Sequence, residues 1–202
     1  MSYKLNLKDI TKKYGSRIIL DHLDFEFDND HTYIISGTNG CGKSTLLNII
    51  AGYDHDYVGV CETNKLKVAY LLQDDLLFRN LSVREDLLLQ LHALKRTDLS
   101  AVDDVADKLG LGNLLNHKVA ELSGGEKKKV ALGQIILTNA DVILLDEPTS
   151  SIQKEYAQEL MELVYREFKD NILIIASHDK INLDDEAVVK LEIKDGRMNY
   201  GI

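Results

Sequence analysis

The chain has 202 residues and a formal charge of -9, from 24 Lys and Arg against 33 Asp and Glu. This length suits one hydrophobic core, because single cores stop growing near ~250 residues. The acidic balance argues against nucleic acid or an anionic membrane as a direct partner, since both favour clustered Lys and Arg. We therefore expect no nucleic-acid partner, and expect any membrane contact to be made through another protein.

No segment predicts targeting or membrane insertion. The first ten residues lack the apolar core of a signal peptide, and the longest apolar runs, at residues 142–145 and 172–176, are too short to span a bilayer. A cytoplasmic protein is therefore expected. Cys41 and Cys61 cannot form a disulfide framework, and no Cys/His cluster has zinc-ligand spacing, so no structural metal is expected.

The first part of the chain predicts two kinds of sheet. Short apolar or alternating segments at residues 3–7, 23–27 and 33–35 are expected to be strands, with an antiparallel layer at the N-terminus. From Tyr33 the pattern becomes strand, glycine loop and helix (43–51), which is typical of a parallel sheet with crossover helices. The apolar runs at 142–145 and 172–176 are expected to be central strands of that sheet, covered on both faces.

The middle of the chain predicts helices. Leucines recur between residues 87 and 94, and a second helix is expected at about 125–137. We expect an inserted helical lobe at about 76–137, and an α/β core formed by about 1–75 and 138–202. Residues 1–202 would then form a single domain.

The strongest motif is GTNGCGKST, at residues 37–45, which matches the P-loop pattern after a predicted strand and before a predicted helix. Its glycines let main-chain N–H groups wrap a phosphate chain, Lys43 reaches the terminal phosphates, and the Ser44 hydroxyl ligates Mg²⁺. A chance match is expected in on the order of one chain in a hundred, before context is counted. The residues expected to bind nucleotide here are Gly37, Thr38, Asn39, Gly40, Cys41, Gly42, Lys43, Ser44 and Thr45.

A second motif, VILLDEP, places Asp146 and Glu147 at the carboxyl end of a predicted strand. Open α/β sheets bind ligands at that edge. Asp146 is expected to hold Mg²⁺, and Glu147 to polarise an attacking water as a general base. An acidic pair alone is more often a solvated turn or helix cap, but its occurrence with Lys43 favours the catalytic interpretation.

The stretch LSGGE, at residues 122–126, resembles the signature motif of the ABC (ATP-binding cassette) family. An N-terminal aromatic, the P-loop, a glutamine, the signature, the acidic strand end and a histidine follow the family's order over nearly the whole chain. Ser123, Gly124 and Gly125 would form a glycine turn that opens a helix and offers a second anion site. By itself SGG would predict only a flexible turn. A P-loop kinase is another interpretation of the P-loop, but a kinase would not need a second anion site at residues 123–125.

The resemblance implies a P-loop NTPase fold that binds ATP with Mg²⁺, and it implies roles for three more residues. Tyr14 resembles the aromatic that stacks on adenine, although a half-buried strand tyrosine is the alternative. Gln73 resembles the glutamine that completes the Mg²⁺ and water shell and reports nucleotide state to the helical lobe. His178 resembles the histidine that contacts the γ-phosphate and holds the attacking water with Glu147; a lone histidine there is usually only a polar loop residue.

The sequence also departs from the family. Gln153 stands where relatives have an acidic residue, which puts communication between two sites in question. Lys127, Lys128 and Lys129 replace Gln-Gln-Arg after the signature, and we expect them to form a solvated helical face. Cys41 is expected to be a small filler, although oxidation of its thiolate would block nucleotide.

In the family's architecture the signature serves the ATP of another subunit, so the resemblance implies a dimer with a second copy or a paralogous ABC subunit. It further implies an ATPase that energises a separate transmembrane permease and lies on the inner face of the cell membrane. Because little sequence follows residue 193, we expect no C-terminal regulatory domain and favour a small exporter of peptide, bacteriocin or lipid, or an immunity-type system. The alternative is a non-transport ABC ATPase that acts mechanically in repair, translation or cofactor assembly.

Overall fold

The computed structural model describes residues 3–73, 76–150, 152–179 and 181–201. Within them the strands form two sheets, one of three strands in the order β2-β1-β4 and one of six in the order β5-β6-β7-β3-β8-β9. The strands are β1 (Lys4–Tyr14), β2 (Arg17–Asp28), β3 (Thr32–Ser36), β4 (Val58–Glu62), β5 (Val68–Leu71), β6 (Val142–Asp146), β7 (Ile172–Ala176), β8 (Val188–Lys194) and β9 (Arg197–Tyr200).

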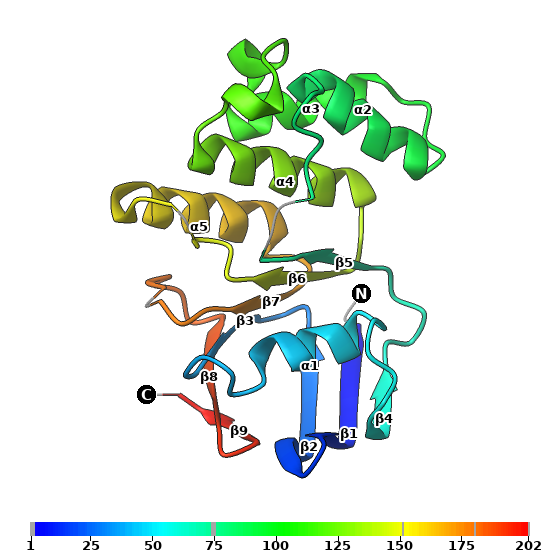
Figure 1. The fold of residues 1–202 in the computed structure, drawn as a ribbon, viewed down its shortest axis with the longest axis vertical. Helices are drawn as coiled ribbons and strands as arrows, with labels where there is room; N and C mark the ends of the chain where they lie inside the picture. Colours follow the sequence, from blue (N-terminus) through cyan, green and yellow to red (C-terminus); the bar gives the residue numbers. More distant parts are fainter. Residues whose placement is uncertain (1–2, 74–75, 151, 180, 202) are drawn as a thin grey trace.

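The helices are distributed in layers around these sheets (Figure 1). Helix α1 lies between the two sheets, α4 and α5 cover the other face of the larger sheet, and α2 and α3 pack on the outer side of α4. Among the described residues, no helix is long and apolar enough to cross a membrane. The helices are α1 (Lys43–Ile50), α2 (Val83–Ala93), α3 (Ser100–Leu109), α4 (Gly124–Thr138) and α5 (Lys154–Phe168), with 3-10 turns at Gly112–Leu114 and Val119–Glu121.

The expected N-terminal antiparallel layer is confirmed, because β1 pairs antiparallel with both β2 and β4. Strand β1 continues well past the predicted end at residue 7. The register shifts between Leu7 and Ile10, and Asp9 has a φ of 53°. This bulge adds a residue between two buried positions and breaks the simple alternation from which the strand was predicted.

The expected parallel sheet is also confirmed. Strands β5, β6, β7, β3 and β8 are parallel, and β9 joins antiparallel to β8. In β6, Val142 and Leu144 pack on the side of α1, while Ile143 and Leu145 pack on the side of α4 and α5. Every residue of β6 and β7 is buried, which is why β7 is apolar throughout and β6 is apolar up to Asp146 at its end.

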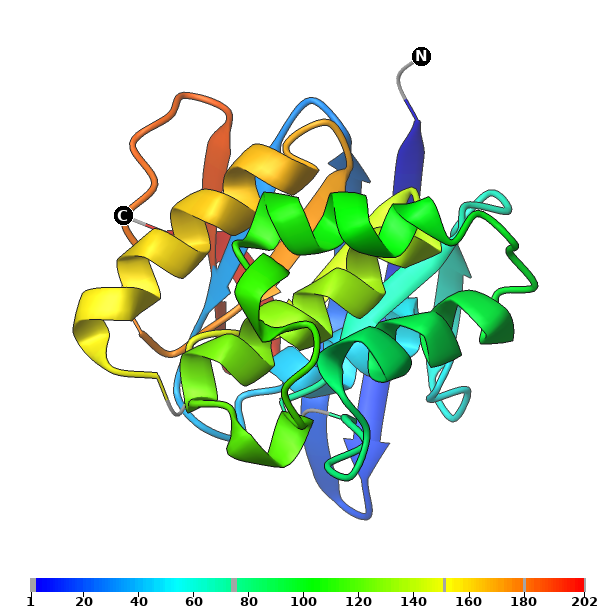
Figure 2. The ribbon, with the colours of Figure 1, turned by 90° about the horizontal axis from the view of Figure 1, so that it is seen from above.

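Helices α2, α3 and α4, which we call the helical lobe, leave the sheet after β5 and return to it at β6, the neighbouring strand. Seen from above, they lie together over the sheet and beside α5 (Figure 2). Helix α2 begins at Ser82 with a capping box in which Glu85 bonds back to the main-chain N–H of Ser82. Helix α4 packs closely on α2 at Gly133, where an added Cβ would lie 3.0 Å from Leu87 Cδ2.

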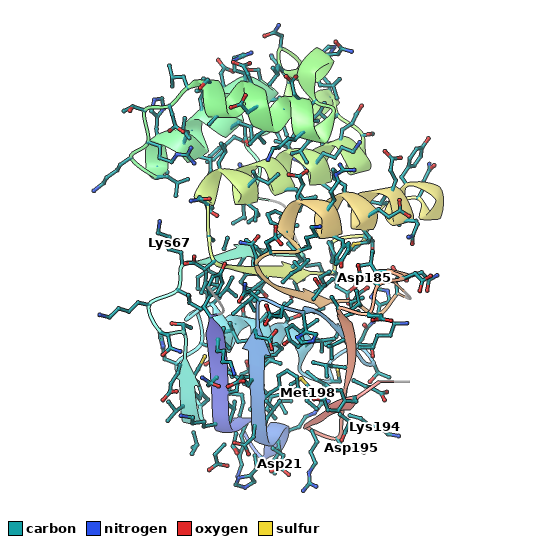
Figure 3. All side chains as sticks on the ribbon, turned by 180° about the vertical axis from the view of Figure 1, so that it is seen from behind. Asp21, Lys67, Asp185, Lys194, Asp195 and Met198 are labelled. Atoms are coloured by element: carbon teal, nitrogen blue, oxygen red, sulfur yellow. The ribbon has the colours of Figure 1, made fainter. Side chains whose placement is uncertain are left out.

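The two sheets are joined at one end of the molecule. There the β8–β9 turn, which includes Lys194 and Asp195, lies beside Asp21 of β2 (Figure 3). The main-chain N–H of Asp21 donates to the carbonyl of Gly196 at 2.9 Å. Since the P-loop lies between β3 and α1, this junction helps to fix the position of the loop relative to the antiparallel sheet.

Candidate active site

Residues from six separate parts of the chain line one hollow of about 500 Å³. They come from the end of β1, from β2, from the P-loop (residues 37–45) with the start of α1, and from the segments that follow β5, β6 and β7. The hollow brings together most of the predicted nucleotide-site residues, whereas Gly37, Thr38, Cys41 and Asp146 lie outside its lining. The lining residues are Tyr14, Ile19, Asn39, Gly40, Gly42, Lys43, Ser44, Thr45, Gln73, Glu147 and His178.

The P-loop has a conformation that requires glycine. Gly37 and Gly42 have φ angles of 146° and 116°. A Cβ on Gly37 would lie 2.6 Å from Cys41 Sγ and 2.7 Å from the carbonyl oxygen of Ile193. Both positions therefore combine a backbone angle that L side chains avoid with a close neighbour. The loop closes on itself through a hydrogen bond from Cys41 N to Thr38 O at 3.1 Å.

Lys43, Glu147 and His178 form a charged cluster. Lys43 Nζ donates to Gly37 O at 2.9 Å and lies 3.6 Å from Glu147 Oε1. Nδ1 of His178 lies 2.8 Å from Glu147 Oε2, and the main-chain N–H of His178 donates to the same carboxylate. Lys43 and Glu147 are both buried, so their ion pair is screened little by water, whereas the His178 side chain is half exposed. The hydrogen bond to Glu147 raises the pKa of His178 above its ordinary value.

The backbone at Glu147 explains how its side chain enters the hollow directly after a strand. Glu147 has a φ of 49°, in the left-handed region, and its N–H donates to Ala176 O in the adjacent β7 at 2.9 Å. Such a conformation is costly for a residue with a side chain and persists where the surroundings hold it. Here strand β7 holds the peptide, and His178 beyond that strand holds the carboxylate.

Asp146 is buried and has one carboxylate oxygen engaged and one not. Tyr70 donates its hydroxyl to Asp146 Oδ2 at 3.2 Å, while Oδ1 has no hydrogen-bond partner among the described residues. Burial raises the pKa of Asp146, and the hydroxyls of Ser44 and Tyr70 oppose that effect. A buried oxygen of this kind, next to a serine hydroxyl, fits the oxygen ligands that Mg²⁺ prefers.

No cluster of three or more His, Cys, Asp or Glu side chains in the described part of the chain could hold a metal ion. A single carboxylate with a hydroxyl is nevertheless the protein contribution expected for Mg²⁺ that shares its coordination with phosphates, because this ion keeps waters and substrate oxygens in its shell. The donor set therefore fits a nucleotide-bound Mg²⁺ better than a resident structural ion.

Tyr14 is the last residue of β1 and lies at the rim of the hollow, where it is 55% exposed. Nζ of Lys12 lies 4.8 Å from the centroid of its ring. Lys12 itself is buried and is ion-paired with Asp54 at 2.9 Å. The ring is thus supported from the protein while remaining accessible to a ligand.

Three residues near the hollow were not predicted from the sequence. Arg17 donates to the carbonyl of Gly40 at 3.3 Å, Tyr70 binds Asp146, and Lys12 supports Tyr14. Tyr70 could have been found as the one polar side chain in a short apolar strand that ends beside Gln73. Arg17 and Lys12 flank Tyr14, but their contacts depend on how the β1–β2 turn meets the P-loop.

The signature turn (residues 123–125) lies away from this hollow. Ser123 is the N-cap of α4, and its hydroxyl accepts from Glu126 N while Glu126 bonds back to Ser123 N at 2.7 Å. The turn lines a separate groove of about 590 Å³ together with Gln153 and Tyr156. The P-loop and the signature turn therefore lie at the starts of two different helices and line two separate hollows.

The expectation of a solvated lysine face is wrong for Lys128. Its side chain is 3% exposed, and Nζ donates to the carbonyl oxygen of Gln73 at 3.1 Å. Lys127 and Lys129 are partly exposed, as expected of the outer face of a helix. Consecutive helix residues point in directions about 100° apart, so a run of three lysines cannot lie on one face.

Comparison with known proteins places these features in a family. A sequence model described as "ABC transporter" matches residues 20–150, which contain the P-loop, the signature turn and the acidic end of β6. The chain belongs to the ABC transporter family.

Two relatives of this ABC chain carry names that describe import. One is the sn-glycerol-3-phosphate import ATP-binding protein UgpC of Ruegeria sp. (strain TM1040), 32% identical over 193 residues that cover 88% of this chain and 55% of that protein. The other is the xylose/arabinose import ATP-binding protein XacJ of Haloferax volcanii, 31% identical over 171 residues that cover 78% of this chain and 45% of that protein. The chain thus spans about half the length of these two curated relatives.

Proposed function

We propose that this chain binds and hydrolyses ATP and energises a separate membrane permease. The observation that carries this proposal is the meeting of Lys43, Glu147 and His178 in a hollow lined by the P-loop. A cation can hold phosphate oxygens, a carboxylate can accept a proton from water, and a histidine can orient that carboxylate, so the three groups together suit transfer of a phosphoryl group to water.

Each group has a position that suits its role. Lys43 exchanges its bond to Gly37 O for the β- and γ-phosphates, and the P-loop N–H groups hold the remaining phosphate oxygens. Tyr14 stacks on adenine at the rim. Glu147 accepts the proton of the attacking water, and His178 orients that carboxylate. The remaining P-loop residues supply the wall of the phosphate site.

Ser44, Gln73 and Asp146 would hold the Mg²⁺ that accompanies the nucleotide. The free Oδ1 of Asp146 and the nearby Ser44 hydroxyl support this assignment. When bound, Mg²⁺ neutralises charge on the phosphates and on the departing group. The hydroxyl of Tyr70 keeps Asp146 Oδ2 occupied, so that only Oδ1 is presented to the ion.

Function requires two chains in this proposal. The signature turn lines a groove with Gln153 and Tyr156 and shares no lining residue with the P-loop hollow. Its N–H groups can therefore serve the nucleotide of another chain, either a second copy or a paralogous ABC subunit. ATP would then be clamped between the P-loop of one subunit and the signature turn of the other.

The permease is expected to contact the helical lobe. A hollow of about 450 Å³ between the end of β5 and α2 is bordered by Leu76, Phe78 and Leu89, which are 72%, 56% and 42% exposed. Apolar side chains gathered at one exposed hollow suit an apolar protein segment. Through this contact the chain would lie on the cytoplasmic face of the cell membrane. Both named relatives are import proteins, so they lend no support to export, and we assign no cargo.

Phosphate release from Mg-ATP tests this function directly. Wild-type protein should hydrolyse ATP, and Glu147→Gln should lower the rate by ~10² or more while ATP binding survives, because the amide keeps the shape but cannot accept a proton. Lys43→Ala should remove most ATP affinity. A matched control, Lys65→Ala, changes an exposed lysine in the turn after β4 and should leave both properties unchanged. Equal hydrolysis by wild type and Glu147→Gln would overturn the assignment of the base.

A further inference from the structure

Lys128 is a charged residue buried between the lobe and the larger sheet. Only 3% of it is exposed, and its ammonium group donates to the main-chain carbonyl of Gln73. Hydrogen bonds from a charged donor in a poorly hydrated setting are stronger and more directional than neutral ones on the surface. Gln73 is thereby held to helix α4 through its backbone, which leaves its side chain at the hollow.

A second contact ties the chain to α4 a few residues later. Asp86 of α2 is buried and accepts from the main-chain N–H of Phe78 at 2.9 Å and from Nε2 of Gln134 in α4 at 2.6 Å. Phe78 is therefore connected through Asp86 to the same helix that holds Gln73. The two contacts fix the chain to α4 at Gln73 and at Phe78.

Helix α4 also carries the signature turn. Ser123 is its N-cap, and Lys128 lies five residues later, about 7.5 Å along the helix axis. The capping box of Ser123 and Glu126 satisfies main-chain N–H groups of the first turn and so stabilises the helix between Ser123 and Lys128. Displacement of Gln73 by a ligand in the hollow would therefore reach Ser123 through Lys128 and one and a half turns of helix.

We propose that Lys128 is a positioning residue that joins Gln73 to the signature turn, so that nucleotide in a chain's own hollow sets the placement of the turn it offers to a second chain. This inference rests on the two-chain ATP site proposed above. Coupling of this kind is reciprocal, so the second chain's nucleotide would also hold Gln73 in place.

The test uses Lys128→Met in the Glu147→Gln background, because methionine fills a buried space of similar length without donating a hydrogen bond. The ATP concentration that gives half-maximal dimer should rise about tenfold, which is in the ordinary range of coupling between sites. ADP affinity should change little, since Lys128 does not line the hollow. The matched control is Lys127→Met, at the preceding and more exposed position of α4. Lys128→Arg keeps a hydrogen-bond donor, so the ATP concentration for half-maximal dimer should stay close to that of the parent protein.

A second readout does not depend on dimerisation. Mn²⁺ affinity, measured by EPR with a non-hydrolysable ATP analogue on dilute protein, should fall several-fold in Lys128→Met if Gln73 is misplaced. Thermal unfolding of all variants separates this effect from a general loss of fold. If the parent Glu147→Gln protein forms no dimer with ATP, the proposed two-chain site is wrong. The Mn²⁺ affinity then tests by itself whether Lys128 positions Gln73. If Lys128→Met matches Lys127→Met in each assay performed, the proposal for Lys128 is overturned.

Discussion

Nδ1 of His178 lies 2.8 Å from Oε2 of Glu147, so the histidine that follows β7 is hydrogen-bonded to the carboxylate that follows β6. The two strands are neighbours in the parallel sheet, with Asp146 opposite Ala176. The pair therefore depends on the register of the sheet, and its charge state can be measured without any ligand.

Glu147→Gln should lower the pKa of His178 toward its ordinary value. Hydrogen bonding and charge at Glu147 raise the pKa of His178. The ion pair therefore stabilises the folded protein fully at pH values below the pKa that histidine has in the unfolded chain. Its contribution to stability is lost as the pH rises through the higher pKa of the folded protein. An NMR titration of His178 in both proteins at one ionic strength measures the difference. Identical titration curves would show that Glu147 does not hold the imidazole in solution.

Gly37→Ala should lower the free energy of unfolding by about 1–3 kcal/mol and weaken ATP binding, because its Cβ would meet Cys41 Sγ and Ile193 O. Gly125→Ala is the matched control, since it has no atom within 4 Å of the added Cβ and lies in the first turn of α4. Its stability should be equal or slightly higher, as alanine favours helix. Thermal unfolding and ATP titration of both variants check this. Equal stabilities would contradict the close approach at Gly37.

Tyr14→Ala should weaken ATP and ADP to the same extent, by roughly 1 kcal/mol, because stacking on the base is independent of the γ-phosphate. Tyr14→Phe keeps the ring above Lys12 and should retain most of the affinity. Calorimetric titration of both nucleotides measures the effect. Should the alanine variant bind ATP as wild type does, Tyr14 is not the adenine contact.

Gln153→Asp should stabilise the protein by about 0.5–2 kcal/mol. Gln153 is the N-cap of α5, has a φ of -63° and a ψ of 141°, and makes no side-chain capping hydrogen bond. Aspartate at this position accepts from main-chain N–H groups of the first turn and carries charge suited to the helix dipole. Gln153→Ala is the control, and denaturant unfolding measures the stability of both variants. A free energy of unfolding for Gln153→Asp no higher than that of Gln153→Ala would refute the prediction.

The same substitution returns an acidic residue to a position beside the signature turn, where the family has one. We therefore expect Gln153→Asp to raise the Hill coefficient for ATP in hydrolysis. Initial rates over a range of ATP concentrations measure this coefficient. An unchanged value would mean that glutamine serves this protein as well as the acid does.

The elements predicted best were those whose sequence reports a single physical requirement. Residues 172–176 form β7 as predicted, because a strand covered on both faces is apolar throughout. Helix α4 begins within one residue of its predicted start, because Ser123 and Glu126 form a capping box. The P-loop was found because its glycines have conformations that few other residues adopt.

What the sequence did not predict depends on contacts between distant segments. The burial of Lys128 follows from the position of Gln73 after β5, and the bond from Tyr70 to Asp146 follows from the pairing of β5 with β6. The left-handed conformation of Glu147 is held by a hydrogen bond to β7. None of these relationships is encoded in spacing along the chain. They arise from the tertiary arrangement.

In the function proposed here, ATP joins two chains by bridging the P-loop of one and the signature turn of the other. The most direct test of this bridging is the molar mass of Glu147→Gln, measured by size-exclusion chromatography with light scattering at high protein concentration, because dimer formation depends on concentration. Ser123→Arg is added to place bulk and charge in the signature turn. Ser82→Arg is the matched control, since it disrupts the same kind of capping box at the start of α2.

We expect Glu147→Gln to be a dimer with Mg-ATP and a monomer with ADP. Adding Ser123→Arg should abolish the dimer while ATP still binds, and adding Ser82→Arg should leave the dimer intact. A dimer that forms equally without ATP, or that survives Ser123→Arg, would contradict the proposal.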